Sequence, residues 1–570
     1  MRYGGARLIR FIAVGAVLTL VTVACSSDGG GGGEATGQPK QGGQAVFGAE
    51  QWPQCVNPIT SCAYASWYLY TVQNAVMPRL LELDTEGNFI AGDQSLATEV
   101  PTLENGGVTE DPFTVTYKLK PDVVWEDGSP ITAEDVEFTW KAQMNTRGAI
   151  STTGYDQIKS VDTSDPSTVT IEFTEPYVDW PDLFGGALQF VLKKDAFPDA
   201  NAEKPDLSSE MLEEVPFSGG PWILESWNKQ ESLLVPNDAW WGDKPLLDQV
   251  SFVRRQNQTT ELNSLKSGEV SVIYPQPSNV SLLDQVADTP AIETVAGDSP
   301  FWEAIHFNHE APPLNDPVVR EAMMYAINRQ AVVDTIIKLN NPEAQVLNCF
   351  GWLPPVGEWC DDTDFAEFTY QPAKSIEILE GAGYDCSGVP DSPCEKDGEP
   401  LSIEYVTTAG NDRRADTQAL LKEQAKPAGF DLQTKVEDAT FLFSNILVKG
   451  DYQMTEFAFG GSPDPAVTSI MACDQIPSEE NGFSGQNTDF WCNEQATKLM
   501  HDSDKELDPA KRLEMIHQIG DFTVEDFVGI PIYLFPQPTA WRSDKIAGPV
   551  GTYNETIYSS FYNMHEWYVP

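Results

Sequence analysis

The chain has 570 residues, of which 41% are hydrophobic, so it can form folded cores and does not have the composition of a disordered protein. Its 86 acidic and 35 basic residues leave a formal net charge of −51, which we interpret first as solubility. Such a surface repels phosphate backbones and anionic lipid headgroups, so nucleic-acid binding is excluded and the body of the protein should not lie on a membrane.

The N-terminus has the pattern of a secretory signal. Three arginines precede an apolar run that ends at Ala24, directly before Cys25. The run is shorter than the about 20 residues that a membrane-spanning helix needs, although a permanent N-terminal anchor helix is the alternative. We therefore predict a signal peptide over residues 1–24 and a Gly-rich tether over 25–44.

Strands and helices alternate through the rest of the chain. Alternating apolar side chains predict strands over residues 113–119 and 167–173. Apolar side chains at helical spacing predict helices over the ranges 132–144, 259–269, 315–338 and 372–384. Strands mixed with helices in this way predict α/β domains.

Several helix ends carry capping residues. Thr132 and Asp135 form a capping box. Asp316 can N-cap a helix whose first residue is Pro317. Gly268 is placed to end the helix before it.

The cysteines predict disulfides. There are nine, and removing Cys25 leaves an even number that falls into close couples around short loops. Many pairings are possible, and we predict the local ones, which persist outside the cytoplasm. The predicted pairs are Cys55 with Cys62, Cys349 with Cys360, Cys386 with Cys394, and Cys473 with Cys492. A metal site is disfavoured because no C-x-x-C motif occurs and the five histidines are not at ligand spacing with the cysteines.

Motifs of common enzymes are absent. The sequence has no Walker-type phosphate loop, no H-E-x-x-H motif and no G-x-S-x-G elbow. With so many acidic residues, a glycosidase carboxylate pair has almost no specificity as a signal. We therefore expect a protein that is not an enzyme and has no cofactor.

Seven strings in order carry a resemblance to a known family. The string "DGSPITAEDV" within residues 115–141 is the most recognisable. The others are the strings at residues 218–252, 261–272, 305–333, 373–384, 420–433 and 461–467. Together they resemble the extracytoplasmic solute-binding proteins of family 5, the peptide and oligopeptide-binding proteins of ABC importers. The string "VTVACSS" likewise resembles a lipobox, which implies lipidation of Cys25.

The family resemblance implies an α/β fold of the periplasmic-binding-protein type, a clamshell with an extra lobe. Lobe I would comprise residues 45–86, 216–300 and 538–570. Lobe II, the extra lobe, would span 87–215, and lobe III would span 301–537. A ligand would be enclosed between lobes that close about a hinge.

The resemblance also suggests ligand contacts, each with packing or surface placement as its alternative. Gln51 and Trp52 would end the first strand near the cleft, and Trp302 would precede the strand that contains "HFN". Arg413, or its neighbour Arg414, could bind a ligand carboxylate. Phe457 and Phe459 could stack on a ligand.

One position departs from the family. In peptide-binding relatives a carboxylate that pairs with the peptide ammonium lies three residues before "DP", where this chain has Gly461. Ser462 and Asp464 belong to the same candidate loop. Because a buried ammonium without an anionic partner is costly, either another acid supplies the charge or the ligand has no free ammonium there.

We therefore predict a monomeric substrate-binding lipoprotein that captures a peptide or similar medium-sized polar solute and delivers it to an ABC permease. It would be anchored to the outer face of the bacterial cytoplasmic membrane through Cys25. An oligosaccharide, opine or siderophore-like ligand is the first alternative. A secreted α/β hydrolase is the second, and a surface interaction protein with no small ligand is the third.

Overall fold

The structure is a computed structural model of the chain. It describes residues 39–50, 52–63, 67–85, 87–186, 189–201, 203–274, 281–295, 298–339, 341–351, 359–460, 467–536, 539–551 and 561–570. The predictions of lipidation at Cys25 and of ligand contacts at Gln51, Gly461, Ser462 and Asp464 therefore concern positions outside the described residues.

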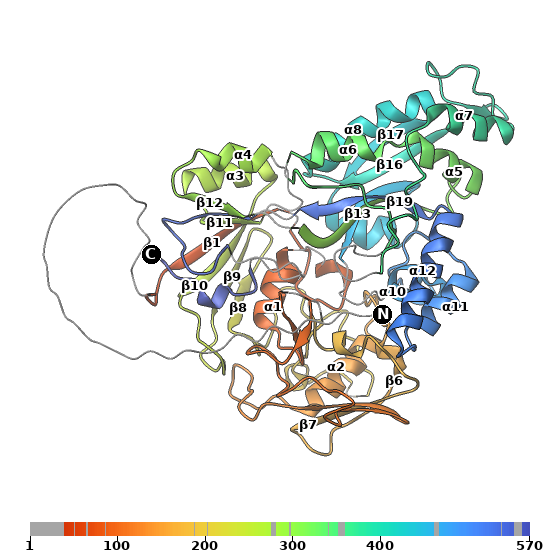
Figure 1. The fold of residues 1–570 in the computed structure, drawn as a ribbon. Coiled ribbons are helices and arrows are strands. Elements are labelled where there is room, and N and C mark those ends of the chain that lie inside the picture. Colours follow the sequence, from red (N-terminus) through yellow and green to blue (C-terminus); the bar gives the residue numbers. More distant parts are fainter. Residues whose placement is uncertain are drawn as a thin grey trace, which may run out of the picture. The chain divides into compact units, whose positions relative to one another are not determined.

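A seven-stranded mixed sheet combines segments that are far apart in the sequence (Figure 1). Its strands, in spatial order, are β12 (Ile292–Val295), β20 (Thr539–Arg542), β11 (Val272–Tyr274), β1 (Gln44–Ala49), β10 (Gln249–Arg254), β9 (Glu231–Pro236) and β8 (Trp222–Trp227). The strand β1 runs parallel to both of its neighbours. Phe47 on β1 stacks on Phe252 with ring centroids 4.6 Å apart, and this pair forms part of the core.

A four-stranded antiparallel sheet forms a second unit of the core. Its order is β4 (Val108–Glu110), β5 (Phe113–Lys118), β7 (Thr168–Phe173) and β6 (Ile158–Asp162). The strands predicted at 113–119 and 167–173 are confirmed as β5 and β7, whose apolar side chains alternate into the core. The helix α2 (Ala133–Asn145) contacts this sheet and begins at the predicted capping box of Thr132 and Asp135.

A five-stranded mixed sheet contains the strands that position the candidate site. Its order is β17 (Asp431–Glu437), β16 (Ser402–Thr408), β18 (Met454–Gly460), β13 (Asp298–Phe307) and β19 (Gly529–Pro536). The strand β16 is parallel to β17 and β18, whereas β13 is antiparallel to β18 and β19. In Figure 1, α8 (Asp412–Ala425) lies alongside β16 and β17.

The remaining elements are short strands and helices. The hairpins are β2 (Glu82–Leu83) with β3 (Phe89–Ile90) and β14 (Glu395–Lys396) with β15 (Glu399–Pro400). The other helices are α1 (Asn74–Val76), α3 (Gln258–Ser267), α4 (Ser281–Ala287), α5 (Pro317–Ala326), α6 (Arg329–Val332), α7 (Pro372–Gly381), α9 (Ala439–Phe441), α10 (Thr468–Met471), α11 (Glu494–Ser503) and α12 (Pro509–Glu525). Gly268 ends α3 in the left-handed conformation, as predicted. Within the described part of the chain, no helix is long and apolar enough to cross a membrane.

The prediction of one continuous helix over 315–338 is wrong. The chain forms α5, then leaves helical geometry at Ile327 and Asn328, and resumes as α6 and a π-helical turn, η6 (Val333–Ile337). Asn328 starts the second helix because its side chain accepts a hydrogen bond from the backbone N–H of Ala331. Buried Arg329 then donates to the backbone carbonyls of Leu347 and Phe365, which redirects the chain. Apolar periodicity continues across the break and does not reveal it.

The limits of the three lobes stay a prediction. The strands of the seven-stranded sheet come from ranges assigned to lobe I, except that β1 begins at Gln44, the last residue of the predicted tether. The strands of the four-stranded sheet come from lobe II. The five-stranded sheet lies in lobe III, except that β13 begins three residues before the predicted limit.

Candidate functional site

A pocket that is open to solvent lies where residues of the three predicted lobes meet, and its empty space, counted together with solvent at the mouth, is about 580 Å³. Its walls come from the loop between Cys55 and Cys62, the segment after α2, the π-helical turn η8 (Leu442–Leu447) with β18, and a loop before α11. The lining residues are Ser61, Gly148, Ala149, Ile150, Phe443, Leu447, Val448, Phe457, Ala458, Phe459, Phe483, Gly485, Gln486 and Thr488.

Aromatic side chains of β18 form the wall of the cavity on the sheet side. Phe457 and Phe459 are two residues apart, so they project from the same face of the strand. Their rings are 5.0 Å apart, and the ring of Phe443 from η8 meets Phe457 edge to face at 5.5 Å. Phe459 is half-buried, so part of its ring is accessible.

A second aromatic layer supports this wall. His306 on β13 stacks on Phe457 with centroids 4.0 Å apart, and Trp302 lies 5.5 Å from Phe459. Both residues are fully buried, and His306 Nδ1 lies 3.1 Å from Asp489 Oδ2. Trp302 therefore sits behind the cavity wall rather than in the lining.

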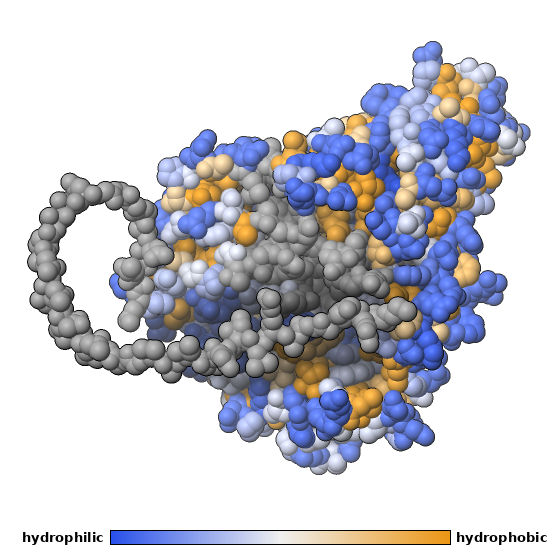
Figure 2. Space-filling view, in the orientation of Figure 1, coloured by the Kyte–Doolittle hydropathy of each residue, from blue (hydrophilic) through white to orange (hydrophobic). Residues whose placement is uncertain are grey.

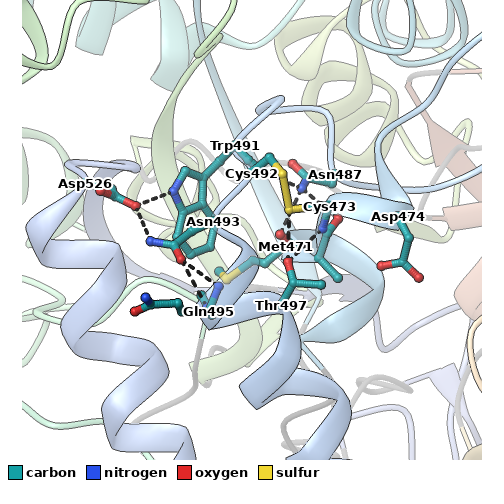
Figure 3. The surroundings of a disulfide bond; sticks show 12 residues. Met471, Cys473, Asp474, Asn487, Trp491, Cys492, Asn493, Gln495, Thr497 and Asp526 are labelled. Atoms are coloured by element: carbon teal, nitrogen blue, oxygen red, sulfur yellow. Dashed lines mark hydrogen bonds between the residues drawn. A yellow bond between two sulfur atoms is a disulfide. The ribbon is translucent and has the colours of Figure 1, made fainter.

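A disulfide-bridged loop forms another wall. Figure 3 shows the disulfide bond between Cys473 and Cys492. The segment between these cysteines carries Phe483, Gln486 and Thr488 of the lining. Within this segment the side-chain amide of Asn487 donates to the backbone carbonyls of Met471, Ala472 and Trp491 at 2.8–3.0 Å. These bonds fix the backbone beside the lining residues.

The third side of the cavity belongs to lobes I and II. Ser61 lies beside Cys62, whose disulfide with Cys55 ties that loop. Residues 148–150 follow α2, and the hydroxyl of Ser484 donates to the carbonyl of Ala149 at 2.8 Å. This bond joins two walls that are far apart in the sequence.

The opposite face of β13 and β18 carries a buried ionic cluster. Glu303 on β13 accepts bonds from Arg414 Nε at 2.7 Å and from Arg413 Nη2 at 3.1 Å. The guanidinium of Arg413 also lies over the rings of Tyr533 and Phe535, at 5.4 and 4.8 Å from their centroids. Burial alone would raise the pKa of Glu303, but the charges of the two arginines lower it below its ordinary value.

Glu456 on β18 is the second carboxyl of this cluster. It accepts a hydrogen bond from the hydroxyl of Tyr405 on β16 and is fully buried. Burial and the nearby negative charge of Glu303 raise the pKa of Glu456 to about 8. The cluster therefore holds one ionised and one largely protonated carboxyl at neutral pH.

The structure places the predicted ligand residues at different sites. Phe457 and Phe459 line the cavity, and Trp302 packs directly behind Phe459. Arg413 lies in the ionic cluster. Trp52 is buried, and its ring packs on another tryptophan. Its indole N–H donates to the backbone carbonyl of Asn228 at 2.8 Å. The backbone carbonyl of Trp52 accepts a hydrogen bond from the hydroxyl of Thr440 on α9 at 3.4 Å. The ligand roles of these residues stay predictions.

Several lining residues were not predicted from the sequence. Phe443, Phe483 and Ile150 belong to three segments with no shared motif. The one available signal was the disulfide prediction, because Phe483 lies between Cys473 and Cys492 and Ser61 lies between Cys55 and Cys62. All four predicted pairings are confirmed. In the described part of the chain, no group of three or more potential metal ligands comes together.

On the face drawn in Figure 2, hydrophilic side chains cover much of the described surface and hydrophobic ones gather in separate patches. This agrees with the formal net charge of −51. The apolar lining of the cavity thus contrasts with the charged composition of the chain as a whole.

Comparison with protein families finds a match over residues 95–475 to the model described as bacterial extracellular solute-binding proteins, family 5 Middle. Among curated proteins, the oligopeptide-binding protein AppA of Bacillus subtilis is 24% identical over 573 residues, covering 98% of each chain. The oligopeptide-binding protein OppA of the same organism is 22% identical, covering 80% of this chain and 81% of the relative.

Solved structures confirm the predicted fold class. The structure of AppA from Bacillus subtilis in complex with a nonapeptide matches with a TM-score of 0.80 and 22% identity, covering 94% of this chain and 100% of that one. A periplasmic EDTA-binding protein, EppA, matches with a TM-score of 0.79 and 22% identity, covering 94% of this chain and 97% of the other. At this level of identity the likeness concerns the fold.

Proposed function

Because this chain belongs to family 5 of the bacterial extracellular solute-binding proteins, we propose that it captures a peptide or similar medium-sized polar solute for an ABC importer. The observation that carries the proposal is likeness over 98% of the chain to an oligopeptide-binding protein. The pocket supports it, since residues from the three predicted lobes converge on one space.

The proposed mechanism is reversible binding with no covalent chemistry. The cavity lies where contacts between lobes are made, such as the bond from Ser484 to Ala149 and the bond from Thr440 to Trp52. A ligand that contacts both sides favours the state in which they meet, because it binds that state more tightly. The protein would act as a monomer and release its ligand to the permease.

Membrane attachment is a further part of the proposal. Cys25 would carry the lipid, and the Gly-rich stretch after it would act as the tether. The anionic body would then stand off from an anionic membrane surface. Cys25→Ser should release the protein from the membrane fraction, and unchanged retention would show that the attachment is wrong.

The test of ligand capture uses residues 26–570, which keep every described residue. Native mass spectrometry identifies any ligand that co-purifies, and thermal unfolding is followed against peptide and oligosaccharide libraries. A binder at 100 times its Kd should stabilise the protein by about 2.7 kcal/mol. An empty protein with no thermal shift against any member would overturn the proposal.

The position of Gly461 suggests how peptides would be recognised. The family's amine-binding carboxylate is missing there. Free-amine dipeptides should therefore bind weakly, and tight binding of one would mean that another acid pairs with the ammonium.

A further inference from the structure

The part of the cavity lining that the structure describes carries no charged side chain. Every lining residue among those described is apolar, glycine, or one of the neutral polar residues Ser61, Gln486 and Thr488. A charged ligand group placed here would lose its water without gaining an ionic partner, which is costly. The described walls therefore disfavour a carboxylate or an ammonium.

Aromatic and aliphatic surface is left open in this space. Phe443, Phe459, Phe483, Val448 and Ile150 are half-buried and line a pocket that is open to solvent. Their accessible apolar surface is area that an apolar group of a ligand can bury. Aromatic walls add edge-to-face contacts to the area that is buried.

The walls are held in place before any ligand arrives. On the sheet side, His306 stacks on Phe457 and Trp302 packs on Phe459. On the loop side, the disulfide between Cys473 and Cys492 and the three bonds of Asn487 fix the segment that carries Phe483. A pocket held in this way loses little conformational entropy on binding.

The backbone at Phe483 supplies an independent observation. Its φ is +62°, a left-handed conformation that bulky residues rarely adopt and that tends to occur at ligand clamps. The neighbouring loop also requires Gly485, whose φ is +106° and where a Cβ would lie 2.2 Å from the carbonyl oxygen of Gln475. The left-handed conformation of Phe483 therefore costs conformational energy, and the loop maintains it with Phe483 in the cavity lining.

We infer that this cavity is a specificity pocket for one uncharged apolar side chain of the ligand, aromatic or branched aliphatic, and that it anchors the ligand in place of an amine-binding carboxylate. The inference rests on the proposed function and deepens it.

The test measures binding of N-acetylated pentapeptides to residues 26–570 by calorimetry. In a scan of positions, Phe, Leu, Ala, Asp and Lys replace one residue at a time in a poly-Ala-Gly host. At one position Phe or Leu should bind at least about tenfold more tightly than Ala, while Asp and Lys bind more weakly than Ala.

Variants of the lining residues test whether the preference for an apolar side chain arises in this cavity. Phe483→Ala and Phe459→Leu should each reduce the preference for Phe over Ala at that position by at least about threefold, and little change the affinity for the Ala peptide. Phe441→Ala is the matched control, because Phe441 is 45% exposed on the neighbouring helix α9 and does not line the cavity. Thermal unfolding shows that each variant is folded, and Phe459→Leu keeps an apolar side chain there.

The outcomes separate the two proposals. Peptides that bind with equal affinity whatever the side chain, or a preference that Phe483→Ala and Phe459→Leu leave intact, would overturn the pocket and leave ligand capture standing. If no peptide binds, with or without an apolar residue, peptide capture itself is overturned and the pocket falls with it.

Discussion

The two faces of β13 and β18 differ sharply although the same two strands build both. One face presents Trp302, His306, Phe457 and Phe459, which support or line the cavity. The other presents Glu303 and Glu456, which are buried against the arginines of α8 and against Tyr405. Alternation of side chains along a strand allows two environments so close together. Under the proposed function, the aromatic face serves the ligand and the ionic face serves the stability of the lobe.

The largest loss of stability is expected when the buried ionic cluster, here called the ionic face, loses its central carboxylate. Glu303→Ala leaves two buried guanidinium groups without their carboxylate, which should lower the free energy of unfolding by about 3–5 kcal/mol in urea titrations. Glu404→Gln is the control, because Glu404 is an exposed carboxyl on β16 and should change stability by less than about 0.5 kcal/mol. A loss of under about 1 kcal/mol for Glu303→Ala would show that the cluster is not needed for folding.

The next largest loss of stability is expected when the disulfide of the cavity loop is removed, and this change should also affect ligand binding. Replacing both Cys473 and Cys492 by Ser opens the cavity loop, and the loop-closure model gives a loss of about 3 kcal/mol. The apolar preference should weaken as well, because Phe483 is no longer held in place. Replacing both Cys386 and Cys394 is the matched control, since that loop contributes no lining residue and should cost stability while leaving the preference intact. Equal effects of the two double variants on binding would contradict the role of the cavity loop.

A smaller loss of stability is expected when the pair of His306 and Asp489 on the aromatic face is broken. His306→Phe leaves buried Asp489 without its partner and should lower the free energy of unfolding by about 2 kcal/mol. In a double-mutant cycle with Asp489→Ala, the two losses should fall short of additivity by about 1 kcal/mol. Strictly additive losses would mean that the pair does not couple β13 to the cavity loop.

Per pH unit, the smallest expected effect is the pH dependence of the ionic face. Since the pKa of Glu456 is raised to about 8, the native state holds a proton that the unfolded state releases above its ordinary pKa of 4.5. The stabilisation is complete below pH 4.5 and is lost as pH rises through about 8, with a slope of up to about 1.4 kcal/mol per pH unit. Glu456→Gln should flatten this slope between pH 5 and pH 8 in denaturation experiments, whereas Glu404→Gln should not. Identical slopes for wild type and Glu456→Gln would show that Glu456 is ionised in the native state.

Much of the fold could be predicted from local patterns. The capping box at Thr132, the proline that starts α5 and the glycine that ends α3 act through neighbouring residues, so the sequence reveals them. The break at Asn328 was missed because it depends on carbonyls brought by Leu347 and Phe365. The candidate site was predicted in part, since Phe457 and Phe459 lie two residues apart on one strand, while Phe443 and Phe483 carry no signal that connects them to it.

By itself, the sequence determined the family, the mixed α/β class and the four local disulfides. Each of these depends on an ordered set of motifs or on residues that are close along the chain. Only the tertiary structure decided what lies on either side of β13 and β18. It paired Arg413 with Glu303 across 110 residues of sequence and joined Ser484 to Ala149 across 335 residues. The physical reason is that a strand's alternation specifies which residues share a face, but the charge and shape of what packs there come from distant segments.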